Sequence, residues 1–196
     1  MIFVEHIHRD RATPWEVFRK LGVQDWVSEG DTMIANLGRT MRLAPEPHYM
    51  AWWQIPSIAR MDEWEAHFRK PEGRLYLAES PTNKALNFTR CGLYDGIIGD
   101  GTVPSGLHLV EYFVPDPAGR DAVKRWFADR AGNAKTGRLT YVLTRVGLLG
   151  PNPGGIALWT FDSYAEAEPF LRTRAPDSVM KIEEAGLYRN FGDDIP

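Results

Sequence analysis

The sequence of 196 residues contains one cysteine, Cys91, so it can form neither an internal disulfide nor a zinc site built from several cysteines. It lacks a run of about 18 apolar residues, and charge follows the first four residues, which argues against a signal peptide. Lys and Arg form no basic cluster, and the net charge is −3. We therefore expect a soluble cytoplasmic protein without nucleic-acid or membrane partners, and we interpret Cys91 as a small buried strand residue.

The sequence does contain an internal repeat, and its hydrophobic content of 43%, with 12% aromatic residues, is ample for a packed core. Two tripeptides recur at one offset of 106 residues (110 minus 4, and 159 minus 53): Val4-Glu5-His6 with Val110-Glu111-Tyr112, and Ala51-Trp52-Trp53 with Ala157-Leu158-Trp159. Equal spacing of two motifs indicates one unit written twice.

A third echo locates an insertion and a boundary. Gly92-Leu93-Tyr94 matches Gly186-Leu187-Tyr188 at an offset of 94 residues (186 minus 92). The first copy therefore holds 12 extra residues (106 minus 94), which we assign to the Pro- and Gly-containing segment 69–87. The stretch 99–106 is rich in turn-forming residues and poor in apolar ones, which is typical of a linker. We predict units at 1–98 and 107–196.

Both units show the same order of predicted elements. Alternation and apolar runs predict strands at 2–8, 32–43, 49–55 and 88–94, and again at 107–114, 139–148, 156–161 and 186–190. Helices are expected at Thr13, after Ser57, after Pro117 and at Ser163, the last ending near Pro176. Strand, helix, two strands, helix, strand is the ferredoxin-like βαββαβ pattern. We expect an α+β fold in which two tandem units pack sheet to sheet as one intrachain barrel.

This order resembles the dimeric α+β barrel superfamily, which includes proteins similar to antibiotic-biosynthesis monooxygenases, EthD-like proteins and NIPSNAP-like proteins. The residues that carry the resemblance are the opening strand Val4-Glu5-His6-Ile7 and the segment 157–164, a third strand running into its helix. The resemblance implies a barrel usually made by two subunits, and a homodimer of this chain is left open. In haem-degrading relatives an Asn, a Trp and a His form the site; here His6, Ile55 and His67 stand at those positions.

Strand alternation predicts which side chains meet. It places Val4 and His6 on one face of the first strand and Glu5 on the other, and the resemblance implies that the His6 face looks into the barrel. His6 is the expected base, because imidazole titrates near neutrality, and Tyr112 at the matching position is the expected proton donor. Expected substrate-binding residues are His8, Trp53, Tyr94, Trp159 and Tyr188. Glu5 and Glu111 are expected to face the helices, each with a polar partner.

His6-X-His8 is a candidate for two metal ligands, since imidazoles on one strand face can chelate one ion. It would need a third ligand such as His48 or His108, and no local spacing predicts one. We therefore expect neither a metal nor an organic cofactor.

Three functions follow as hypotheses. The first is a cofactor-free isomerase, lyase or cyclase that moves protons on a small hydrophobic, aromatic substrate. The second is a cofactor-independent monooxygenase, in which the deprotonated substrate reacts with oxygen. The third is a carrier that binds haem or another hydrophobic ligand. The first two share a deprotonation step, and the sequence does not separate them.

Overall fold

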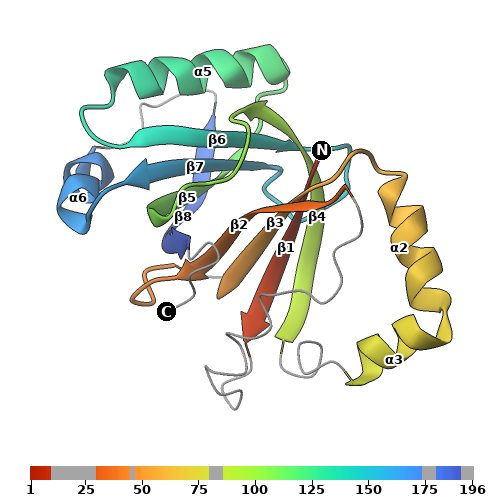
Figure 1. The fold of residues 1–196 in the computed structure, drawn as a ribbon. Helices are drawn as coiled ribbons and strands as arrows, with labels where there is room; N and C mark the ends of the chain where they lie inside the picture. Colours follow the sequence, from red (N-terminus) through yellow and green to blue (C-terminus); the bar gives the residue numbers. More distant parts are fainter. Residues whose placement is uncertain (10–29, 45–46, 80–85, 174–179, 191–196) are drawn as a thin grey trace.

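The computed structural model describes residues 1–9, 30–44, 47–79, 86–173 and 180–190, and Figure 1 shows their arrangement. The strands are β1 (Ile2–Arg9), β2 (Thr32–Arg39), β3 (Tyr49–Gln54), β4 (Leu86–Ile98), β5 (Gly106–Val114), β6 (Arg138–Arg145), β7 (Gly155–Phe161) and β8 (Lys181–Asn190). The helices are α2 (Arg60–Arg69), α3 (Pro71–Glu79), α5 (Arg120–Asn133) and α6 (Tyr164–Arg172). The helix expected at Thr13 and the helix end expected at Pro176 fall outside these residues.

The described strands form a closed antiparallel barrel in the order β1-β3-β2-β8-β5-β7-β6-β4. The ring closes within one chain through two seams, in which β2 pairs with β8 and β4 pairs with β6. The predicted α+β fold and intrachain barrel are therefore confirmed. Each half pairs its strands in one order, β4-β1-β3-β2 and β8-β5-β7-β6, whereas the tandem units and their boundaries stay a prediction.

Several strands differ in length from the prediction: β8 begins at Lys181 rather than at position 186, and β6 ends at Arg145 rather than at position 148. β2 ends at Arg39 rather than at position 43, because Met41 and Arg42 have φ angles of 50° and 59° and turn the chain. β4 continues to Ile98, four residues past the predicted end at Tyr94, and this extension carries the seam with β6.

In the second half, α5 and α6 cover the outside of the barrel (Figure 1). α5 contacts β4 and β6, and α6 contacts β7. Phe127 of α5 is fully buried against Phe113, with ring centroids 4.8 Å apart. Ser163 caps α6 as predicted, since its hydroxyl accepts a hydrogen bond of 3.2 Å from the Glu166 amide. The Glu166 carboxylate bonds the amide of Asp162, one residue before the cap.

In the first half, α2 and α3 lie beside the barrel, in the region where extra residues were predicted (Figure 1). α2 begins at Arg60 rather than directly after Ser57, and Ile58, predicted to join its apolar stripe, is 47% exposed. Asp31 anchors the helix, because its carboxylate accepts hydrogen bonds from Arg60 (2.9 Å) and from the indole of Trp64 (3.1 Å).

The glycine in each repeated Gly-Leu-Tyr motif is explained by steric contact with the tyrosine. A Cβ atom at Gly92 would lie 2.7 Å from the ring of Tyr94, and one at Gly186 would lie 3.0 Å from the ring of Tyr188. Each tyrosine ring therefore lies against the strand position of the glycine two residues earlier. Glycine is the residue that permits this close approach, which sets both rings inside the barrel.

Candidate functional site

The barrel interior brings His6 and Tyr112 together, as the sequence predicts. His6 comes from β1 and Tyr112 from β5, and their rings meet edge to face with centroids 5.9 Å apart. Both are nearly buried, at 5% and 6% exposure, and their strand neighbours Val4 and Val110 are fully buried in the same interior cluster. The predicted inner face of both strands is therefore correct.

The centre of the barrel is filled by side chains. Trp52, Tyr94 and Tyr188 all have 0% exposure, so no water-sized space adjoins their rings. The Tyr188 hydroxyl donates to the carbonyl oxygen of Pro47 at 3.1 Å, and within the described residues the Tyr94 hydroxyl has no hydrogen-bond partner. The interior around these three rings is therefore occupied by protein side chains.

The prediction that Trp53 and Trp159 line the interior is wrong. Both lie on the outer face, where the Trp53 indole donates to Glu5 at 2.8 Å and the Trp159 indole donates to Glu111 at 2.9 Å. Trp52 takes the interior position on β3. The third strands are apolar at consecutive positions, so their sequence does not reveal which face is inward.

Glu5 and Glu111 face outward, as expected, but their partners differ. Glu111 accepts two hydrogen bonds from Arg130 of α5, at 2.5 and 2.8 Å. Within the described residues no cation pairs with Glu5, which accepts its hydrogen bond from the Trp53 indole. Burial raises the pKa of Glu5 from 4.5 to about 7, and the indole hydrogen bond opposes this rise only in part.

The surroundings of His6 favour its neutral form. Burial, with smaller contributions from the charges of Arg90 and His8, lowers its pKa from 6.5 to about 4. Arg90 of β4 and Met50 of β3 are the cross-strand neighbours of His6, and the Tyr112 hydroxyl donates to the Met50 sulfur at 3.2 Å. Burial, together with the nearby Tyr188 and Tyr94, raises the pKa of Tyr112 well above its ordinary value, so this phenol stays protonated.

Arg90 is a site residue that the sequence reasoning missed. Its side chain is exposed, and its charge acts on both His6 and Tyr112. A signal was present, because Arg90 lies two residues before Gly92 and therefore shares the inward parity of Tyr94.

The histidines that are candidate metal ligands lie in two separate places. The rings of His8 and His48 lie 5.1 Å apart, while His108 lies elsewhere on β5. His108 Nε2 is 2.9 Å from the Pro104 carbonyl oxygen, which can only accept, so Nε2 carries the proton and Nδ1 accepts from Thr160 at 3.1 Å. In the part of the chain that the structure describes, no three His, Cys, Asp or Glu side chains gather at a metal-binding distance.

The described interior residues do not form a binding site for haem. His67, which stands at the position of the haem-site histidine, lies on α2 beside the barrel, and the centre of the barrel is occupied by the indole of Trp52.

Cys91 is exposed, and the expectation of a buried thiol is wrong. It pairs with Glu5 across the strands, so its side chain lies on the outer face of β4. None of the helices described here combines the length and hydrophobicity needed to cross a membrane.

No family model and no curated protein matches the chain. Solved structures do match it over nearly its whole length. An anthrone oxidase-like protein has a TM-score of 0.57 at 13% identity, covering 96% of this chain and 90% of its own. A mutant chlorite dismutase from Candidatus Nitrospira defluvii in complex with cyanide has a TM-score of 0.55 at 12% identity, with 98% and 91% covered. A proposed monooxygenase from Fusobacterium nucleatum has a TM-score of 0.50 at 10% identity, with 97% and 94% covered.

At these identities the likeness concerns the fold. The chain shares its α+β barrel fold with these structures, and the described strands of one chain close the barrel. This agrees with the resemblance found in the sequence.

Proposed function

We propose that the protein is a small-molecule enzyme that removes a proton from an acidic carbon of an aromatic substrate, with His6 as the base. The observation that carries the proposal is the buried imidazole of His6, packed edge to face on Tyr112 inside the barrel, and its lowered pKa favours the neutral form. A base in this form can accept a proton without first losing one.

The low pKa of His6 makes it a weak base until substrate binds. Removal of a proton leaves negative charge on the substrate, and an anion beside the imidazole favours its protonated form. The guanidinium of Arg90, next to His6 on the neighbouring strand, can stabilise an enolate oxygen in the same place. Deprotonation and charge stabilisation would thus come from adjacent residues.

We further propose that the resulting carbanion reacts with molecular oxygen. A CH₂ carbon between two aromatic rings would lose one proton to His6 and add O₂ to form a peroxide anion, which takes the proton back. Loss of water from this hydroperoxide gives a ketone, so one O₂ is consumed and one water is released per substrate. The likeness to the anthrone oxidase-like structure supports anthrone as a first substrate to test.

The experiment follows oxygen uptake with anthrone for the wild type, His6→Gln and His108→Gln. Removal of a general base typically lowers turnover about 10²- to 10⁴-fold, so His6→Gln should lose that much. His108→Gln is the matched control, because His108 is also buried with its pKa lowered to about 4 but is bonded to Pro104 and Thr160.

The shared first step has its own readout, which is hydrogen–deuterium exchange at the substrate carbon without oxygen. His6-dependent exchange without oxygen uptake would exclude the oxygenase and favour an isomerase, lyase or cyclase. Exchange and oxygen uptake that are unchanged in His6→Gln would refute His6 as the base.

A further inference from the structure

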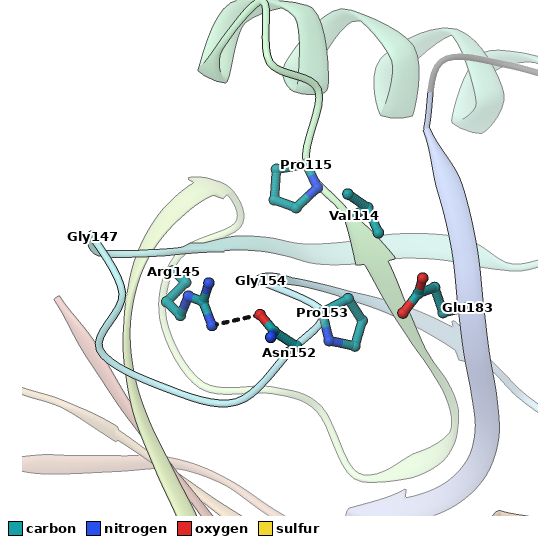
Figure 2. A pocket seen from close by; sticks show the side chains of 8 residues that line it. All are labelled: Val114, Pro115, Arg145, Gly147, Asn152, Pro153, Gly154 and Glu183. Atoms are coloured by element: carbon teal, nitrogen blue, oxygen red, sulfur yellow. Dashed lines mark hydrogen bonds between the residues drawn. The ribbon is translucent and has the colours of Figure 1, made fainter.

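A cleft of about 400 Å³ opens where β6 ends, and Figure 2 shows the side chains around it. Its apolar wall includes Val114 and Pro115, and its charged groups are Arg145 and Glu183. The volume lies in the usual range for a small-molecule site. Neither His6 nor Tyr112 lines this cleft, so an inference about it does not depend on the proposed barrel chemistry.

Arg145 uses only one of its three nitrogens within the described structure. Its Nη1 donates to the carbonyl oxygens of Gly150 (2.8 Å) and Pro151 (3.0 Å) and to Oδ1 of Asn152 (3.0 Å). Its Nε is buried and has no hydrogen-bond partner among the described residues. Nη2 also makes no hydrogen bond in the described structure and, unlike Nε, is not buried, so it is the nitrogen of Arg145 that can donate a charge-assisted hydrogen bond to a ligand carboxylate.

Glu183 supplies the opposite charge. Figure 2 shows Arg145 and Glu183 on opposite sides of Pro153, and no ion pair joins these two described residues. The Glu183 carboxylate contacts Lys181 at 3.1 Å and is partly exposed. A cleft with one cation and one anion favours a ligand that carries both charges over a simple anion, which Glu183 would repel.

We propose that this cleft binds a small zwitterion with an apolar side chain, such as an α-amino acid. The carboxylate accepts a hydrogen bond from Nη2 of Arg145, the ammonium group faces Glu183, and the side chain packs on Val114 and Pro115.

Gly154 offers a variant that places a methyl group against the Arg145 guanidinium and keeps the charge of Arg145. A Cβ atom at Gly154 would lie 3.5 Å from Nε and 3.7 Å from Cζ of Arg145, which is ordinary contact distance, so Gly154→Ala should fold. Gly132→Ala is the matched control, because a Cβ at Gly132 of α5 has no neighbour within 4 Å. Replacement of Arg145 itself would release the loop carbonyls and is less informative.

The test is an NMR titration of the full chain with L-leucine, 4-methylpentanoate, which lacks the ammonium group, and isoamylamine, which lacks the carboxylate. L-leucine should give saturable shifts of the Gly147 and Gly154 amides and bind more tightly than either analogue. Gly154→Ala should abolish this binding, Gly132→Ala should keep it, and Glu183→Gln should weaken L-leucine about tenfold or more without weakening 4-methylpentanoate.

Three results would each overturn the proposal. The first is no saturable shift with L-leucine in the wild type. The second is equal binding of L-leucine and 4-methylpentanoate, which would indicate an anion site. The third is unchanged L-leucine binding in Gly154→Ala.

Discussion

Replacement of Glu5 by Gln should stabilise the protein above neutral pH, whereas the same change at Glu111 should destabilise it. The two carboxylates occupy matching places, and each accepts a hydrogen bond from a tryptophan indole. Glutamine keeps an acceptor for that indole and removes the charge. The outcomes differ because Arg130 neutralises Glu111, and no cation among the described residues pairs with Glu5.

The magnitude for Glu5 follows from its pKa. The folded value of about 7 exceeds the ordinary value of 4.5, so between these pH values the folded state holds a proton that the unfolded state has lost. Ionised Glu5 therefore destabilises the fold progressively from about pH 4.5 to pH 7. At about 1.36 kcal/mol per pH unit the full effect is about 3 kcal/mol, and partial solvent contact reduces it to about 2–3 kcal/mol.

For Glu111→Gln the expected change in the free energy of unfolding has the opposite sign. Loss of its charge leaves the Arg130 guanidinium buried without its anion, although the rings of Trp159 and Phe170 still lie within 5.0 Å of it. Breaking a buried ion pair in this way typically destabilises a protein by about 3–5 kcal/mol.

The assay is urea denaturation of the wild type and both variants between pH 4.5 and pH 8. Subtraction of the wild-type free energy of unfolding at each pH cancels the titration of the histidines. The Glu5→Gln difference should grow from about zero at pH 4.5 to about 2–3 kcal/mol at pH 8. A difference that stays flat over this range would refute the assignment of the buried, unpaired carboxylate.

Two further predictions concern local structure. Ser163→Ala removes the cap of α6 and should lower the free energy of unfolding by about 1 kcal/mol, measured by urea denaturation, with Ser163→Asn retaining most of the stability. The pKa of His108 is lowered from 6.5 to about 4, so the unfolded state takes up a proton first as pH falls between these values and stability is lost. His108→Asn should lose this part of the acid dependence in the same assay, and an unchanged pH profile would contradict it.

The barrel could be predicted from the sequence because each repeated motif and each turn signal is a short, continuous segment. The offset of 106 residues and the breaker-rich stretch 99–106 both mark the order of elements, and each half pairs its strands in the same order. The seams were less accessible, since they depend on β4 continuing to Ile98 and pairing with β6, a contact between segments distant in sequence.

The site was predicted in part for a similar reason. Alternation along the first strand separates His6 from Glu5, and the resemblance implied that the His6 face is the inner one. The third strand places Trp52 and Trp53 side by side and gives no such alternation. The sequence nevertheless held a clue, because Glu5 precedes Trp53 by the same 48 residues by which Glu111 precedes Trp159. A carboxylate that needs a donor and an indole that needs an acceptor belong on one face.

Among the described residues, the two seams of the barrel join fewer residue pairs than the other neighbouring strands do. β2 meets β8 over three residue pairs, Leu37 to Arg39 against Asn190 to Tyr188, whereas β1 meets β3 over six. The side chain of Asn190 bridges this short join, accepting from the Asn36 amide at 2.9 Å and donating to the Val103 carbonyl at 2.6 Å. Because few backbone pairs join the described residues of β2 and β8, the side chain of Asn190 carries part of the contact that closes the barrel, and its loss should weaken this seam.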